Sequence, residues 1–149
     1  GTPSELNTID FITIATTGNA VDFGDTVVTG YQGGPASSST RGEIMGMYNG
    51  GQTGTVEYIT IASQGNSIDY GDLSVTRVNA GGISNSIRGI LPGGQGTDGN
   101  SIDTIDFNII AHGGTSVDFG DCTMTRGGKT SGASQAHGGL NDGYQGTRP

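Results

Sequence analysis

Pairs of aspartates spaced three residues apart are the strongest candidates for chemistry in this sequence. Each pair encloses an aromatic residue and a glycine, and the pairs are Asp22 and Asp25, Asp69 and Asp72, and Asp118 and Asp121. Paired carboxylates can hold a hard cation such as Ca²⁺, but such a site needs about six oxygen ligands, and no EF-hand-like loop surrounds these pairs. Aspartate beside a strand-end glycine also accepts hydrogen bonds from turn amides. We therefore favour a structural turn role, keep Ca²⁺ binding as the alternative, and predict no resident metal or cofactor.

Other reactive side chains are few and dispersed. The two histidines, His112 and His137, have no cysteine or glutamate at metal-ligand spacing. Serines are numerous, but no Gly-x-Ser-x-Gly nucleophile elbow is present. The single cysteine, Cys122, cannot form an intrachain disulfide. No residue in a repeated position has a catalytic environment, so we predict a non-enzymatic protein without catalytic residues.

The aspartate pairs belong to a longer segment that the chain repeats three times, at residues 9–30, 56–77 and 105–126. Its central glycine recurs at 24, 71 and 120, which are steps of 47 and 49 residues. Each copy predicts a β-hairpin, because two runs of β-branched and aromatic residues flank a short Gly/Asn/Ser turn. The first strand carries apolar groups on both faces, so we expect it to lie between two layers. The residues that define the repeat are Phe23, Gly24, Asp25, Arg41, Tyr70, Gly71, Asp72, Arg88, Phe119, Gly120 and Asp121.

Each hairpin is followed by a run of small residues and then by a run that begins Arg-Gly, or His137-Gly138 in the last unit. Four short strands per repeat of about 48 residues are typical of a propeller blade. We therefore predict one all-β domain, 1–149, with units at about 8–54, 55–103 and 104–149. The small-residue strand is expected to be innermost, where only small side chains fit.

Two further predictions concern contacts between these units. The aromatic residues of the Phe/Tyr-Gly-Asp triplets should be buried between neighbouring blades. The arginines of the Arg-Gly strands should donate hydrogen bonds to backbone carbonyls or to an aspartate of another blade, in preference to capturing a ligand. The residues concerned are Phe23, Tyr70 and Phe119 for burial, and Arg41 and Arg88 for the hydrogen bonds.

The order Arg77, small residues, RGILPGG at 88–94, a variable loop, IDF at 105–107, VDF at 117–119 and Arg126 resembles a divergent kelch repeat. Phe23, Tyr70 and Phe119 stand where kelch blades usually carry a tryptophan in the last strand. The sequence pattern "IDFITIA…GN…DFGD" is also similar to Gly-rich repeats of tail-fibre and other virion proteins of phages that infect aquatic bacteria, notably cyanophages. This resemblance implies a virion appendage or an extracellular surface-binding role.

Composition narrows the classes of function. The chain has 30 glycines and a formal net charge of -8, which alone would suggest low complexity. The apolar residues are nevertheless concentrated at matching repeat positions, and disorder does not account for that. Six basic residues, dispersed among 14 acidic ones, argue against binding to nucleic acid. No apolar run approaches the roughly 20 residues that a membrane-spanning helix needs.

We therefore expect a structural or receptor-binding repeat module of a larger assembly, with virion proteins or a cell-surface glycan or protein as partners. A sugar-binding lectin is the alternative, and the tyrosines in Gly-rich connections, Tyr31, Tyr48 and Tyr144, suit sugar or protein contact as well as simple loop anchoring. An enzyme on a propeller scaffold is a third possibility, which would require an acidic or histidine cluster outside the repeat. Propellers have typically four to eight blades, so we predict that the three units are completed by oligomerisation, two copies making six blades. The alternative is that the sequence is part of a longer polypeptide, which would then supply the missing blades.

Overall fold

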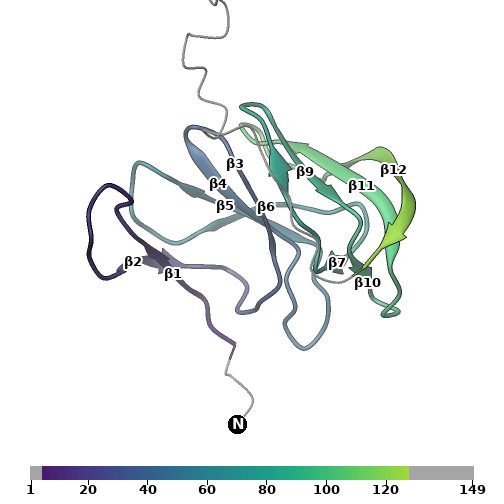
Figure 1. Ribbon diagram of the computed structural model, residues 1–149, viewed down its shortest axis with the longest axis horizontal. Helices are drawn as coiled ribbons and strands as arrows, with labels where there is room; N and C mark the ends of the chain where they lie inside the picture. The colour runs from purple at the N-terminus through teal and green to yellow at the C-terminus, as the bar shows by residue number, and fades with distance from the viewer. Residues whose placement is uncertain (1–4, 128–149) are drawn as a thin grey trace, which may run out of the picture.

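The computed structural model describes residues 5–127, and these residues form β-strands and turns without any helix (Figure 1). The predicted all-β class is therefore confirmed. His137, Tyr144 and the second half of the last repeat unit lie outside the described residues. The strands are β1 (Thr8–Phe11), β2 (Val21–Asp25), β3 (Gly34–Ser37), β4 (Arg41–Met45), β5 (Thr55–Thr60), β6 (Ile68–Asp72), β7 (Arg77–Val78), β8 (Ile83–Ser84), β9 (Arg88–Pro92), β10 (Gln95–Gly96), β11 (Ile102–Ile109) and β12 (Val117–Arg126).

Two four-stranded antiparallel sheets make up most of the fold. Their strand orders are β3-β4-β5-β6 and β8-β9-β11-β12, and two-stranded sheets are formed by β1 with β2 and by β7 with β10. In each large sheet, a small-residue strand and an Arg-Gly strand pair with the hairpin that follows them in the sequence. The sheets do not close into a ring within residues 5–127, so the propeller stays a prediction.

The three hairpins share one irregularity, a β-bulge near the start of the first strand. The register shifts between Ile9 and Asp10, between Val56 and Glu57, and between Ile105 and Asp106. The extra residue on the facing strand is in each case the aromatic residue of the Phe/Tyr-Gly-Asp triplet. A bulge re-aims its side chain, and each of these rings meets an aromatic ring of the facing strand edge to face. The pairs and their centroid distances are Phe11–Phe23 at 6.1 Å, Tyr58–Tyr70 at 4.7 Å and Phe107–Phe119 at 5.7 Å.

The main core lies between the two four-stranded sheets. The small-residue strands β3 and β8 are neighbours there, and the Ser37 amide donates to Ser84 Oγ at 3.1 Å. Small side chains are required because the backbones nearly touch: a Cβ added to Gly82 would lie 1.9 Å from the Pro35 carbonyl oxygen. The buried cluster consists of Ala36, Met45, Val56, Leu73, Ala80 and Leu91.

The first hairpin is less covered than the sequence predicted. Strand β1 ends at Phe11, and the side chains of Ile12 and Ile14 are 62% and 94% exposed. At the equivalent strand β5, Val56 and Glu57 are fully buried. The expected position between two layers is therefore right for β5 and wrong for β1. The physical reason is that Val56 packs into the core between the two large sheets and Glu57 is covered by the loop at Val27 and Val28, whereas no layer among residues 5–127 covers Ile12 and Ile14 in this way.

Candidate functional site

The Phe/Tyr-Gly-Asp triplets join each hairpin to the next one. In the first such junction, the carbonyl oxygens of Phe23 and Asp25 accept hydrogen bonds from the amides of Gly65 and Ser67, both at 2.8 Å. In the second, the carbonyl oxygens of Tyr70 and Asp72 accept from Gly114 and Ser116, both at 2.6 Å. The donors and acceptors occupy equivalent repeat positions, so one contact pattern is used twice. We call this pattern the repeat junction.

The glycines of the first two triplets, Gly24 and Gly71, are required by this close approach. A Cβ at Gly24 would lie 2.4 Å from the Gly65 carbonyl oxygen, and a Cβ at Gly71 would lie 2.1 Å from that of Gly114. Neither clash can be relieved by a side-chain rotation, because the neighbouring atoms are backbone. The repeated glycine therefore permits two hairpins to pack backbone against backbone.

Two buried carboxylates reinforce the repeat junction, and the sequence reasoning did not single them out. Glu57 accepts from the amides of Val27 and Val28, both at 2.8 Å, and from Ser67 Oγ at 2.5 Å. Asp106 stands at the equivalent position and accepts from the amide of Ser74 at 2.9 Å and from its hydroxyl. Both acids therefore bind the loop that follows the preceding triplet. These residues could have been found from the sequence, because the first strand of every hairpin carries an acidic residue at the same position. The apolar residues beside it predict that this position is buried.

Arg77 completes the second junction with a buried ion pair. Its Nη2 lies 2.6 Å from Asp106 Oδ2, and the two side chains are 0% and 1% exposed. Its remaining donors reach backbone carbonyls, including those of Gly93 at 3.0 Å and Thr104 at 2.6 Å. Nearly every polar atom of the pair has a partner, which is the condition under which a buried ion pair can be held. The first junction has Gly30 in place of Arg77 and uses the longer Glu57 instead.

Arg41 extends from β4 to the β11–β12 hairpin of the neighbouring sheet. Its Nη1 donates to the carbonyl oxygens of Ile110 at 2.8 Å and Ala111 at 2.9 Å. Its guanidinium lies 4.1 Å from the centroid of the Tyr58 ring and 5.9 Å from that of Tyr70. This contact with carbonyls of another sheet is the kind expected for Arg41.

Arg88, the equivalent residue of β9, is exposed and lies over the Phe107 ring at 5.1 Å. No hydrogen bond links its guanidinium to another described residue. The two arginines thus share the stacking on an aromatic ring but differ in the contact beyond their own sheet. The expected carbonyl partners are found for Arg41 and are absent for Arg88 within residues 5–127.

The predicted burial of the three triplet aromatics is wrong for Phe119. Phe23 and Tyr70 are half-buried, whereas Phe119 is 53% exposed. The next hairpin covers Tyr70 so closely that a Cβ at Gly113 would lie 1.7 Å from its ring. No hairpin follows Phe119 within the described residues, so the same local sequence leaves its ring in solvent.

In two of the aspartate pairs, the first aspartate accepts a hydrogen bond from a nearby amide, at the β-bulge of strands β6 and β12. Asp69 Oδ1 accepts from the amide of Gly71 at 3.2 Å, and Asp118 Oδ1 accepts from the amide of Gly120 at 2.8 Å. These are the hydrogen bonds to backbone amides that the sequence reasoning favoured. The described residues contain no group of three or more histidine, cysteine or acidic side chains placed to hold a metal ion. Cys122 is a free, half-buried thiol, and His112 is exposed in the β11–β12 loop.

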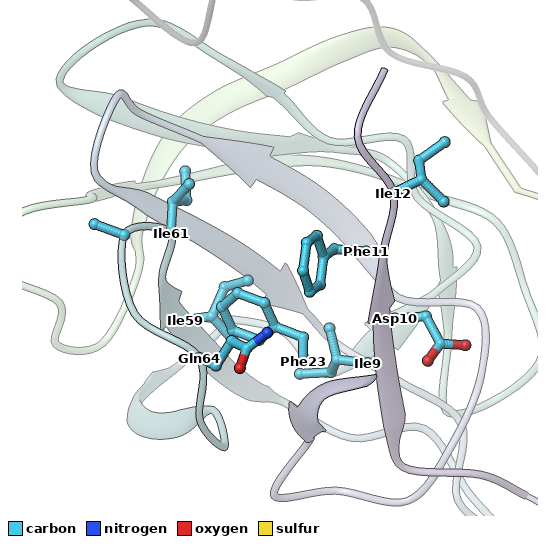
Figure 2. A pocket seen from close by; sticks show the side chains of 9 residues that line it. Ile9, Asp10, Phe11, Ile12, Phe23, Ile59, Ile61 and Gln64 are labelled. Carbon is cyan, nitrogen blue, oxygen red and sulfur yellow. The ribbon is translucent and has the colours of Figure 1, made fainter. Parts of the chain in front are cut away.

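An apolar groove of about 450 Å³ lies at the first repeat junction, between the β1–β2 hairpin and the end of β5 (Figure 2). The rings of Phe11 and Phe23 line one side, and Ile59 and Ile61 line the other. Gln64 contributes an amide, and the Asp10 carboxylate points away from Phe11, to the other side of β1. The chemistry available in the groove is therefore aromatic faces, aliphatic walls and backbone carbonyls.

At the second junction, the Arg41 side chain occupies the equivalent place. Tyr58 and Tyr70 correspond to Phe11 and Phe23, and Ile110 corresponds to Ile61. Ile110 is 1% exposed, whereas Ile61 is 47% exposed. The same position is thus occupied by the Arg41 side chain at the second junction and is an open groove at the first.

No protein-family model and no curated protein matches this sequence. Among solved structures, the chain is similar to a fungal alcohol oxidase of the AA5 family, solved in complex with copper. That likeness has a TM-score of 0.66 and 12% sequence identity over 83% of this chain, which spans 29% of the oxidase chain. Identity this low shows a shared all-β fold alone. The described part of the chain has no helix long and apolar enough to cross a membrane.

Proposed function

We propose that this protein is a non-enzymatic structural repeat module that assembles end to end through its repeat junction, as part of a larger assembly. The observation that carries the proposal is that one set of contacts joins the three hairpins twice, while no residue among 5–127 covers the equivalent groups on the outer sides of the first and third hairpins. The kelch-like propeller is the architecture we propose for the assembly. It is supported by two sheets of equal strand order whose small-residue strands are neighbours.

The exposed surface of β12 corresponds to the acceptor side of a junction. Phe119, Gly120 and Asp121 are the equivalents of Tyr70, Gly71 and Asp72. Nothing among the described residues lies within 4 Å of a Cβ added at Gly120, and Phe119 and Met124 are 53% and 67% exposed. An exposed surface that combines apolar side chains with accessible backbone is typical of a site that another protein covers.

The β1–β2 hairpin corresponds to the donor side. Its carboxylate, Asp10, is exposed, although the equivalent Glu57 and Asp106 are 0% and 1% exposed. Its turn glycine, Gly18, is the equivalent of Gly65 and Gly114, and no described atom lies within 4 Å of a Cβ added there. The hairpin therefore presents the groups that the other two hairpins use to dock.

A second copy docked in this way would place its Asp10 beside Arg126. Arg126 is exposed and is the equivalent of Arg77, whose partner is Asp106. Repetition of one heterologous contact gives a closed ring or an open filament, depending on the rotation between copies. Two copies would supply the six blades predicted from the sequence.

Charge reversal tests this assembly. Asp10→Arg and Arg126→Asp should each weaken association, because breaking a buried ion pair costs about 3–5 kcal/mol, or more than about a hundredfold in Kd. Light scattering should find oligomers of the unaltered chain, monomers of each variant, and restored association when the two variants are mixed. Asp98→Arg, in the exposed turn after β10, is the matched control and should not change assembly. A folded monomer of 15.0 kDa for the unaltered chain would refute the proposal.

The similarity to phage repeats extends the proposal to a virion appendage, where a multivalent array of modules would contact a cell surface. Immunogold labelling of purified virions with an antibody against this chain would test that placement. Labelling confined to soluble protein would contradict it.

Sugar binding is a second candidate, and one observation favours it. Tyr31 is 49% exposed, and its ring lies 5.3 Å from that of Tyr48 at an angle of 42°. An open pair of aromatic rings can stack on a sugar. Glycan-array binding that is lost in Tyr31→Ala would support this function, and an array without signal would remove it.

A further inference from the structure

Within residues 5–127, the outer edge of β1 has no strand partner, whereas the equivalent edges of the other hairpins are each paired with an Arg-Gly strand. Strand β5 pairs with β4 on this edge, and β11 pairs with β9. Within residues 5–127, β1 pairs only with β2. An open strand edge offers unpaired amides and carbonyls to an extended segment, which is the basis of recognition by strand addition.

The groove beside this edge has the chemistry of an arginine site. At the second junction, the Arg41 guanidinium occupies the equivalent place, stacked on Tyr58 and bound to the carbonyl oxygens of Ile110 and Ala111. The groove is lined by Phe11, the equivalent of Tyr58, and by Ile61 and Ala62, the equivalents of the two residues whose carbonyl oxygens bind Arg41. Neither the Ile61 nor the Ala62 carbonyl accepts a hydrogen bond from another described residue.

We propose that the β1 edge and its groove bind an extended segment of a protein partner that carries an arginine followed by a glycine. The segment adds to β1 as an antiparallel strand and places its guanidinium between Phe11 and the carbonyl oxygens of Ile61 and Ala62. This site is separate from the proposed end-to-end assembly, which uses Asp10 and the turn of the same hairpin.

The pairing register defines the sequence that fits. Arg41 lies opposite Thr60, and Arg88 lies opposite Ile109, and both of these residues correspond to Thr13. A small residue fits best at the next position, because a Cβ at Gly42 would lie 3.2 Å from Cγ1 of Ile59, the counterpart of Ile12, which is closer than ordinary van der Waals contact. Three residues after the arginine, β4 and β9 both carry an apolar residue, which is Ile44 in β4 and Leu91 in β9. The expected motif is therefore Arg-Gly-x-apolar.

Electrostatics favour a cationic occupant. The chain has a formal net charge of -8, so a basic peptide is attracted from a distance. In the groove, the aromatic faces and the two carbonyl oxygens can compensate a guanidinium that leaves water, since stacking on a ring and charge-assisted hydrogen bonds both stabilise it. A lysine ammonium lacks the planar shape that allows stacking and two hydrogen bonds together.

Peptide binding tests the proposal. A peptide with the sequence of residues 86–93, which contains Arg88-Gly89, is titrated into the full chain carrying Arg126→Asp, so that end-to-end assembly does not compete. Binding should shift the amide resonances of residues 8–13. The peptide with Arg88→Gln should bind at least about tenfold more weakly, and the one with Arg88→Lys should be intermediate. Failure of the arginine peptide to bind, or equal binding of all three, would overturn the inference without affecting the assembly result.

Protein variants and one further peptide control the interpretation. Phe11→Ala removes a half-exposed ring from the groove and should weaken binding, whereas Phe119→Ala removes an exposed ring at the opposite end and should not. A melting curve of each variant verifies that it is folded. A peptide copied from residues 132–141 carries His137 in place of the arginine. If it binds more tightly than the arginine peptide, the groove does not select a guanidinium and the inference is wrong.

Discussion

Replacing Glu43 by glutamine should stabilise the protein at pH 8 and leave its stability near pH 4.5 almost unchanged. Glu43 lies on β4 between the two large sheets and is 2% exposed. Burial raises its pKa from 4.5 to about 7, against the opposing effects of the Asn108 amide, which donates to Oε1 at 3.3 Å, and of the Arg41 charge. Oε2 has no hydrogen-bond partner among the described residues. Protonation of this carboxyl therefore removes a buried negative charge from the folded protein.

The sign and the size of the effect follow from linkage. Between pH 4.5 and 7 the folded chain holds a proton on Glu43 that the unfolded chain has lost, so stability falls as pH rises through this window. The shift corresponds to about 3 kcal/mol of stability lost once the pH exceeds 7. Glutamine cannot ionise and does not suffer this loss. In a domain of this size, the difference amounts to roughly 6–12 °C in melting temperature.

The assay is urea unfolding of both proteins at several values between pH 4.5 and 8. Taking the difference between them removes the contribution of the other carboxylates. The free-energy difference should be near zero at the acid end and grow until about pH 7. Two curves that run parallel across this range would refute the reasoning, because Glu43 would then titrate alike in the folded and unfolded chains.

Glu57→Gln should lower the free energy of unfolding in the same assay, in contrast to Glu43→Gln. Glu57 accepts three hydrogen bonds, and an amide NH₂ would face one of these donors, so we expect destabilisation by about 1–3 kcal/mol. Arg77→Met should destabilise the chain by about 3–5 kcal/mol, since it leaves the buried Asp106 carboxylate unpaired, and urea titration measures this; a loss below 1 kcal/mol would contradict the ion-pair argument. Gly71→Ala should cost about 1–3 kcal/mol through its clash with the Gly114 carbonyl, whereas Gly51→Ala, with open space around it and no positive φ, should cost much less. Melting curves with and without EDTA should coincide, and a large fall in the presence of EDTA would restore the aspartate pairs as Ca²⁺ ligands.

Local features of the sequence were enough to predict the hairpins and their turns. β-branched and aromatic runs around Gly-rich turns predict strands wherever they occur, and the structure has a strand pair at each of the three places. The hydrogen bonds of Asp69 and Asp118 to amides were also predictable, because an aspartate two residues before a glycine contacts an amide within its own segment. These interactions span a few residues, so the sequence around them contains both partners.

The contacts between repeats depended on the tertiary structure. Phe119 has the same neighbours in sequence as Phe23, yet it is more exposed because no described hairpin packs on it. Arg41 and Arg88 both begin an Arg-Gly strand, but among residues 5–127 only Arg41 has carbonyl acceptors in another sheet.

The partners of Glu57 lie up to 30 residues away and those of Asp106 up to 32, in loops whose backbone amides any sequence would supply. Periodicity identifies which residues share a local conformation, since that depends on adjacent side chains and turns. The burial of a side chain and its hydrogen-bond partners depend on which surfaces meet. Equivalent residues of similar repeats therefore have different neighbours according to their place in the fold.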